Sequence, residues 1–168
     1  MPGAAIGKIL GLGYPGNVAR QADAIITQRP VKGDPISFGD PVILNSDNTY
    51  TKFAAANTAA QFAGIAVREV KQATDYYPVG GNYKENEPCD VISRGTVTIV
   101  CNVGTPTAGG SVYLRITENA TIPNGVVGGF EAAADGTNTI ELTNVKFTTG
   151  DIDADKVAEV TILTKLQP

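Results

Sequence analysis

Three glycines have a spacing that could support nucleotide chemistry. Gly11, Gly13 and Gly16 match the Gly-x-Gly-x-x-Gly pattern of dinucleotide-binding loops. That motif needs a strand before it and a helix that opens at its last glycine. Here strand-like sequence follows instead, so we interpret the glycines as part of a flexible N-terminal segment.

The acidic run at 151–155 has Asp at every second position, as the start of a calcium-binding loop does. A complete loop would need Gly at its sixth position and Glu at its twelfth, where this sequence has Lys156 and Ile162. We therefore expect a polar turn between two strands. A weak surface cation site is the alternative.

The carboxylate pairs Glu85/Glu87 and Asp151/Asp153 could in principle serve a glycosidase. Both pairs lie in turn-like sequence with no apolar neighbours to raise a carboxyl pKa, so we interpret them as solvated loops. The 168 residues include no histidine, which removes the commonest general base and metal ligand. We predict that the protein is not an enzyme and has no catalytic residue, metal or cofactor.

Net charge and hydropathy exclude two classes of partner. The formal net charge is −4 and no cluster of Lys or Arg offers the basic surface that nucleic acid requires. The longest apolar stretches are far shorter than the ~20 residues that span a bilayer, and the N-terminus does not resemble a secretory signal. We therefore predict that the protein has no nucleic-acid or membrane partner. We also predict that it is synthesised in the cytoplasm, where Cys89 and Cys101 are free thiols. A disulfide between them is the alternative.

The elements that must position any site are predicted to be strands. Residues 90–103 alternate between apolar and polar positions, and Ile92 and Val100 break the alternation as if the second face were also partly covered. Gly95 is expected to mark a bulge. At 111–117 a second alternating run is expected to point Arg115 outward. Because a turn-rich connector joins the two runs, we predict that they form an antiparallel pair.

Further strands are expected over five other stretches, with an edge or turn at 36–38 and at most a turn or two of helix in 53–61. The five stretches are 24–27, 41–44, 62–70, 139–148 and 157–166. Many short strands with little helix favour a mainly β fold, a single-domain β-barrel or jelly-roll-like β-sandwich. We expect one β-rich domain at 21–168, preceded by an extended N-terminal arm at 1–20 whose apolar content is too low to fold alone.

The loop 71–88 is polar but carries Tyr76, Tyr77 and Tyr83. Tyrosine among Gly, Asn and Pro is a common composition of interfaces. Equally, one or two of these rings could cover an end of the barrel. Both interpretations stay open at this point.

Six stretches of the chain resemble a known family in their order. They are GYPGNVAR (13–20), ISFGDPV (36–42), FAGIAVREV (62–70), DVISRGTV (90–97), AGGSVYL (108–114) and the pair FTTG (147–150) and VAEV (157–160). In this succession the chain resembles the phage cement proteins, also called decoration or auxiliary head proteins, that coat capsids of the HK97 type.

The resemblance implies a virion structural protein that binds the outer surface of the capsid and stabilises it. The implied partners are the phage major capsid protein and further copies of this chain, in a dimer or trimer. The implied location is the virion capsid surface after synthesis in the bacterial host cytoplasm. Combined with the composition of the arm and the tyrosine loop, it makes six residues candidates for partner contact: Tyr14, Asn17, Arg20, Tyr76, Tyr77 and Tyr83.

Two alternatives remain on the sequence alone. Another head-completion or tail component would share the acidic, β-rich composition. A carbohydrate-binding β-sandwich would usually stack sugars on Trp or Tyr, and with no Trp in the chain only the tyrosine loop could serve.

Overall fold

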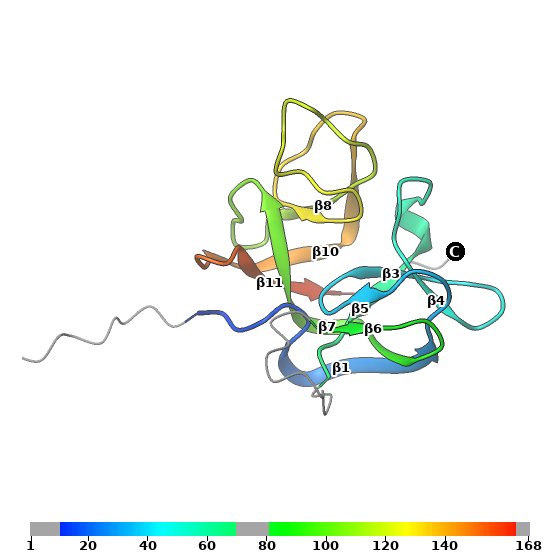
Figure 1. Ribbon diagram of the computed structural model, residues 1–168. Coiled ribbons are helices and arrows are strands. Elements are labelled where there is room, and N and C mark those ends of the chain that lie inside the picture. The colour runs from blue at the N-terminus through cyan, green and yellow to red at the C-terminus, as the bar shows by residue number, and fades with distance from the viewer. Residues whose placement is uncertain (1–10, 70–80, 164–168) are drawn as a thin grey trace, which may run out of the picture.

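The computed structural model describes residues 11–69 and 81–163, and the regular structure within them is almost entirely strand (Figure 1). The strands are β1 (Val18–Pro30), β2 (Ile36–Ser37), β3 (Pro41–Leu44), β4 (Tyr50–Lys52), β5 (Phe62–Ala66), β6 (Asn82–Tyr83), β7 (Pro88–Val103), β8 (Ser111–Arg115), β9 (Phe130–Glu131), β10 (Thr139–Ile152) and β11 (Val157–Ile162). The expected helical turn is present as one 3₁₀ turn, η1 (Ala59–Gln61). No helix in the described ranges is long and apolar enough to cross a membrane.

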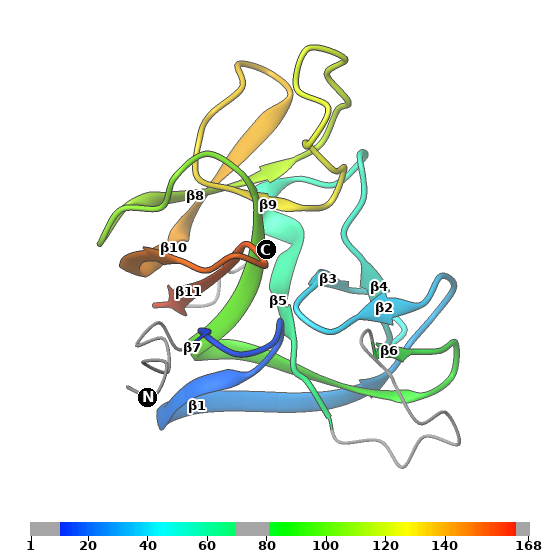
Figure 2. The ribbon, with the colours of Figure 1, turned by 60° about the vertical axis from the view of Figure 1, so that its left-hand side comes forward.

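The main sheet closes on itself around β7. Its strands follow the order β11-β10-β8-β9-β7, and β11 also pairs back with β7, so these five form a barrel (Figure 2). Beyond the barrel, β5, β3 and β4 continue the sheet from β7, while β1 pairs along β7 as an additional strand. The mainly β, barrel-like fold predicted from the alternating sequence is confirmed.

Strand β7 is buried on both of its faces. Val97, Ile99 and Cys101 point into the main hydrophobic core. Thr96 and Thr98, on the opposite face, are 7% and 2% exposed. The breaks in apolar–polar alternation along β7, at Ile92 and Val100, therefore correctly indicated that its second face is partly covered. The β1–β7 register is irregular where Gly95 lies, between the pairs Arg20–Thr96 and Ile25–Arg94, as a bulge at that glycine would require.

A second, smaller core lies beside the barrel, under the pair β2–β6. Ile36, Tyr50, Tyr83, Cys89 and Val91 are all buried in it. Cys89 and Cys101 lie in different cores and both are free thiols, which confirms the first of the two sequence interpretations. Burial raises the pKa of the Cys101 thiol, as expected for a small core residue.

The predicted antiparallel pairing of 90–103 with 111–117 is wrong. Strand β9 lies between β7 and β8, pairing in parallel with β7 at Cys101–Phe130 and antiparallel with β8 at Leu114–Phe130. The relative direction of β7 and β8 was predicted correctly, but the neighbour was not. A two-residue strand inside a long loop is too short to show any periodicity.

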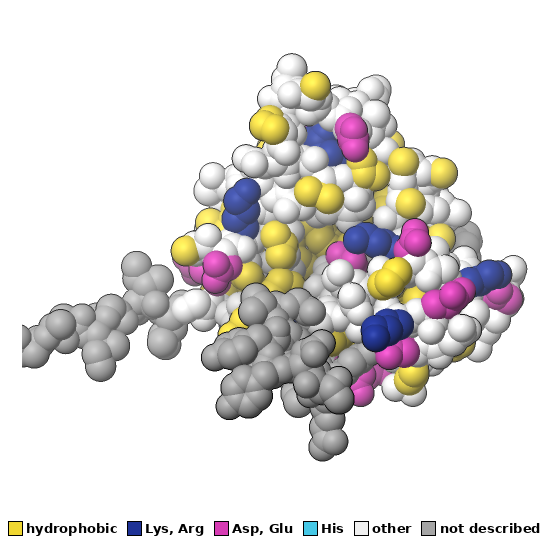
Figure 3. Space-filling view, viewed as in Figure 1, with side chains coloured by type: hydrophobic (Ala, Val, Ile, Leu, Met, Phe, Trp, Pro, Cys, Tyr) yellow, Lys and Arg dark blue, Asp and Glu magenta, His cyan; other side chains and the backbone are white. Residues whose placement is uncertain are grey.

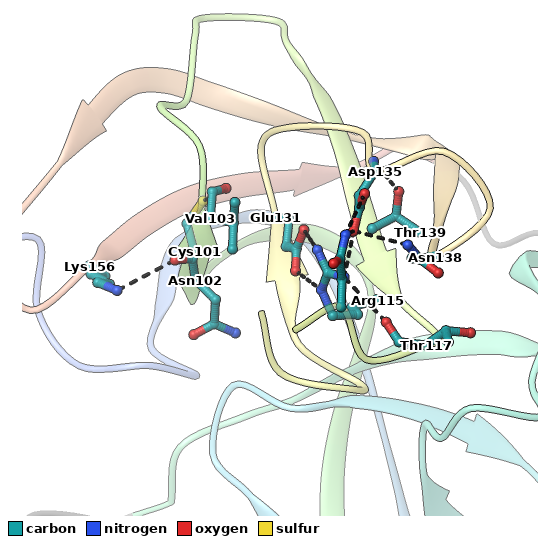
Figure 4. A network of polar contacts seen from close by, with 11 residues as sticks. Cys101, Asn102, Val103, Arg115, Thr117, Glu131, Asp135, Asn138, Thr139 and Lys156 are labelled. Atoms are coloured by element: carbon teal, nitrogen blue, oxygen red, sulfur yellow. Dashed lines mark hydrogen bonds and ion pairs between the residues drawn. The ribbon is translucent and has the colours of Figure 1, made fainter. Parts of the chain in front are cut away.

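The predicted outward position of Arg115 is also wrong. Its side chain is 0% exposed and forms a two-pronged ion pair with Glu131 of β9, also 0% exposed, in which Nη2 lies 2.9 Å from Oε2 (Figure 4). Nη1 donates to Asp135 at 2.8 Å and to the Thr117 carbonyl at 3.2 Å. The connections 116–129 and 132–138 thus cover a face of β8 that alternation alone assigns to solvent.

Asp135 holds the outer end of this network. The pKa of its carboxyl is lowered because Asn119 and Arg115 donate to it. A group with a lowered folded-state pKa adds stability above its ordinary pKa of 3.8 and loses that contribution as the pH falls through the lowered value. At neutral pH Asp135 is therefore ionised and its ion pair with Arg115 is formed. Glu131 raises the pKa of Arg115 further above its ordinary value.

Removing one partner of the buried pair should destabilise the protein strongly. In Arg115→Met the Glu131 carboxylate stays buried without its cation, and we expect the free energy of unfolding to fall by about 3–5 kcal/mol. The measurement is equilibrium unfolding in guanidinium chloride.

Two controls separate burial from loss of charge. Arg94→Met removes an ion pair with Asp23 whose side chains are 46% and 68% exposed, and should cost at most about 1 kcal/mol. The double change Arg115→Met with Glu131→Leu should restore most of the loss. Equal effects of Arg115→Met and Arg94→Met would contradict this assignment.

Candidate functional site

The residues 11–17, which we call the root segment, lie against the outer face of β7 at Thr98. The Gly16 amide donates to the Thr98 carbonyl at 2.7 Å and the Thr98 amide donates to the Asn17 carbonyl at 3.0 Å. The Thr98 hydroxyl donates to the Tyr14 carbonyl at 2.6 Å and accepts from the Asn17 amide at 3.1 Å. One buried hydroxyl therefore fixes the turn 14–17 onto the barrel.

Gly16 is required here by close packing rather than by a phosphate. Its φ is +82°, and a Cβ would lie 2.8 Å from the Ala66 carbonyl oxygen and 2.9 Å from the Gly39 amide. The Gly16 carbonyl accepts from the Arg68 amide at 2.8 Å. No side chain fits this approach without displacing backbone. The glycine spacing that resembles a nucleotide motif thus has a structural cause at its last position.

Asp153 fixes the other end of the root segment. Its Oδ1 accepts from the amides of Asp155 and Val157, at 3.0 and 2.8 Å, which closes the turn between β10 and β11. Its Oδ2 accepts from the Leu12 amide at 3.0 Å. The prediction of a polar turn at 151–155 is confirmed, and the same carboxylate also holds the N-terminal segment.

Three of the predicted contact residues gather at or next to the root segment. Tyr14 is 57% exposed and stacks with Arg68, whose guanidinium carbon lies 4.6 Å from the ring centroid. Arg20 follows in β1 with a side chain 68% exposed, 3.5 Å from Glu159. Asn17 is half-buried between them. Strand β1 already begins at Val18, so the described end of the predicted arm at 1–20 lies on the barrel. The arm itself stays a prediction for residues 1–10, which are outside the described ranges.

Tyr83 of loop 71–88 does not join this group. Tyr83 is 0% exposed, donates its hydroxyl to the Val67 carbonyl at 2.6 Å and packs edge-on against Phe38. Burial raises its pKa. The prediction of Tyr83 as a partner contact is therefore wrong, and instead of covering an end of the barrel the ring belongs to the smaller core beside it. Tyr76 and Tyr77 lie outside the described residues, so their role as partner contacts stays a prediction.

Sequence reasoning missed Thr98, Arg68 and Asp153 as residues that position the root segment. Thr98 had a visible signal, because it follows apolar Val97 in a strand whose second face was expected to be covered. Asp153 was singled out only as part of an acidic run. Its contact with Leu12 spans 141 positions of sequence and leaves no local pattern.

A shallow groove of about 240 Å³ opens next to the root segment. Its walls include Pro15, Phe38, Pro41 and Phe130. Figure 3 shows apolar side chains in the hollow below the upper part of the molecule, which we call the upper lobe. Within the described ranges, no group of three or more His, Cys, Asp or Glu side chains is placed to hold a metal ion. The arrangement at the root segment is one that can bind a partner surface through stacked rings, hydrogen bonds and a neighbouring hollow.

The comparison with protein-family models identifies one family. The model of the XM1 gp53 minor capsid protein family matches residues 3–163, nearly the whole chain. The chain belongs to this family. It is therefore a phage capsid-associated, virion structural protein, as the resemblance of the six sequence stretches implied.

The fold of the family is also found among solved structures. One matching chain comes from the capsid of Myoviridae phage XM1, with 18% sequence identity and a TM-score of 0.73. The alignment covers 99% of this chain and 100% of that chain. At this identity the likeness shows a shared fold. The comparison with curated proteins gives no match.

Removing the Thr98 hydroxyl should loosen the root segment without unfolding the barrel. In Thr98→Val the Asn17 amide keeps the Tyr14 carbonyl at 3.2 Å as an acceptor but loses the Thr98 hydroxyl, and the Tyr14 carbonyl loses that hydroxyl as a donor, at a local cost of about 1 kcal/mol. Hydrogen exchange at the Asn17 amide should then accelerate several-fold. The matched control Thr96→Val loses a bond to Thr161 and should leave exchange at Asn17 unchanged. Unaltered exchange at Asn17 in Thr98→Val would show that the hydroxyl does not fix the turn.

Proposed function

We propose that this protein is a capsid decoration, or cement, subunit that binds the outer surface of an HK97-type capsid and stabilises it. Its partners are the phage major capsid protein and further copies of the same chain, in a dimer or trimer. Synthesis takes place in the bacterial host cytoplasm and the finished protein resides on the virion surface.

The observation that carries this proposal is the root segment. Thr98 and Asp153 fix residues 12–17 at both ends, so the sequence that precedes them starts from a defined position on the body. Tyr14 and Arg20 present exposed side chains around this position. Membership of a minor capsid protein family supports the capsid as the surface that this region meets.

The proposed mechanism needs no catalytic group. Residues 1–10 dock on the capsid, where they add a strand to an exposed sheet edge. Packaged DNA pushes the shell outward, so a subunit that bridges neighbouring capsid proteins raises the free energy needed to separate them. Because an oligomer engages several capsid subunits at once, its apparent affinity exceeds that of one copy by factors of ~10²–10⁴.

Deleting residues 2–10 should abolish stable binding to the capsid while leaving the body folded. The deletion ends before Leu12, so the hydrogen bonds of the root segment to Asp153 and Thr98 are retained. We expect the apparent affinity for expanded capsids to fall by at least about tenfold. Occupancy is measured by cosedimentation of the full chain and of the deletion variant with expanded shells that lack the protein, and shell stability by heating the same samples.

A variant with a Gly/Ser segment of equal length in place of residues 2–10 is the matched control. It keeps the length but not the side chains, and should bind as weakly as the deletion. Undiminished occupancy after the deletion would refute the docking role of these residues. A full-length protein that binds shells without raising their opening temperature would refute the stabilising role.

A further inference from the structure

The connection between β8 and β9, residues 116–129, is long and ordered without regular secondary structure. Its amides form successive tight turns, from Ile122 to the Asn119 carbonyl and from Gly125 to the Ile122 carbonyl, both at 2.9 Å. The Gly128 amide returns to the Arg115 carbonyl at 2.8 Å. Loops of this length in a compact domain are uncommon and are usually functional.

The buried ion pair holds this loop in one conformation. A Cβ at Gly125 would lie 2.3 Å from Arg115 Nε, so the loop closes directly over the guanidinium. Asn119 anchors the start of the loop to Asp135 with two hydrogen bonds of 3.1 and 3.0 Å. Burying an ion pair is costly compared with apolar packing, and its benefit here is a fixed loop shape.

Within this connection Glu118 is charged and exposed, but the stretch that follows it carries no charge. Residues 119–130 include no Asp, Glu, Lys or Arg, although the whole chain contains 30 such residues (17 acidic and 13 basic). Val126, within this stretch, is 54% exposed. Depletion of charged residues is the compositional signal of an interface core. Figure 3 shows the upper lobe with mostly uncharged and apolar side chains at its surface.

The groove beside the loop continues the same neutral surface. Residues 126–130 form one wall and Pro15, Phe38 and Pro41 contribute to the other. Two charged residues line the part of it that the structure describes, Asp40 and Lys52, and they pair with each other at 2.9 Å. The exposed Val126 and the groove that it lines therefore lie on one surface without net charge.

We infer that the loop 119–130 and its groove form the surface through which copies of this chain contact each other. This inference rests on the proposed function, because it names the surface through which the proposed dimer or trimer forms. Each copy carries a formal charge of −4, so two copies approach with least repulsion through a neutral patch. A partner of different net charge would instead favour a patch of opposite charge. Interfaces between identical chains are also more apolar than other protein interfaces.

The position of the loop fits simultaneous binding of two kinds of partner. In both views the tip of the loop lies at the end of the molecule away from β1 (Figures 1 and 2). The root segment runs beside β7 in the lower half of the same views. Pro15 of the root segment lines the groove whereas Tyr14 and Arg20 do not, so the two proposed contacts adjoin at Pro15.

The test compares two exposed aliphatic residues by sedimentation velocity of the full chain over a range of concentrations. Val126→Lys places a charge on the proposed contact, and Ile25→Lys, at a residue 52% exposed on β1, is the matched control. We expect the wild type and Ile25→Lys to sediment as multiples of the 17.4 kDa chain. Val126→Lys should sediment as the monomer, with a dissociation constant at least about tenfold higher. Thermal melts confirm that both variants are folded.

Several outcomes would overturn the inference: a monomeric wild type at every concentration, an unchanged assembly in Val126→Lys, or equal loss of assembly in both variants. Val126→Lys that keeps the assembly but loses capsid occupancy would place the loop against the capsid instead. Failure of the wild type to bind expanded capsids is a separate result, which refutes the proposed function while the sedimentation data still decide the self-contact.

Discussion

The whole architecture depends on the backbone pairing of β7. This strand of 16 residues pairs with β1, β5, β9 and β11. At Ile92 it faces Ile26 on one edge and Ile65 on the other, and at Val97 it faces Val18 and Val160. Its two halves also connect the two hydrophobic cores. Pairing along both edges does not by itself cover a face: Arg94 of β7 is 46% exposed, whereas Thr98 is buried where the root segment lies against it.

Local alternation predicted most of β7 and β10 and the barrel-like fold, because the period of two survives wherever one face packs against a core, but it predicted only 24–27 of β1 (Val18–Pro30). It failed where cover comes from distant sequence. Arg115 occupies a polar position of β8 and would be exposed in an isolated pair, but Glu131 and Asp135 from later in the chain enclose it. Strand β9 escaped prediction for the same reason, since its two residues gain strand geometry only from their neighbours.

The partner-contact role of Tyr14, Asn17 and Arg20 stays a prediction. The structure shows Tyr14 and Arg20 exposed next to the root segment and Asn17 half-buried. Thr98 and Asp153, which hold that segment, were not identified because hydrogen bonds over 81 and 141 positions leave no trace in local sequence. Tyr83 was grouped with its neighbours by composition, whereas burial assigns it to the smaller core.

Rigidity and surface, rather than reactive groups, unify these features. The protein uses its costly interactions, the buried ion pair and the hydrogen-bonded root segment, to hold two surface regions in fixed shapes. One region starts the N-terminal residues from a defined point, and the other presents an uncharged loop. This division suits the proposed function, in which a member of a minor capsid protein family binds a shell and its own copies at the same time.

The proposal that this protein decorates the outer surface of the capsid is tested most directly by cryo-electron microscopy of purified virions. The account predicts density for this barrel on the outer surface of the shell, in many copies, with the root segment facing the major capsid protein. Absence of the chain from the virion surface, or its confinement to a few copies at the neck or tail, would contradict it.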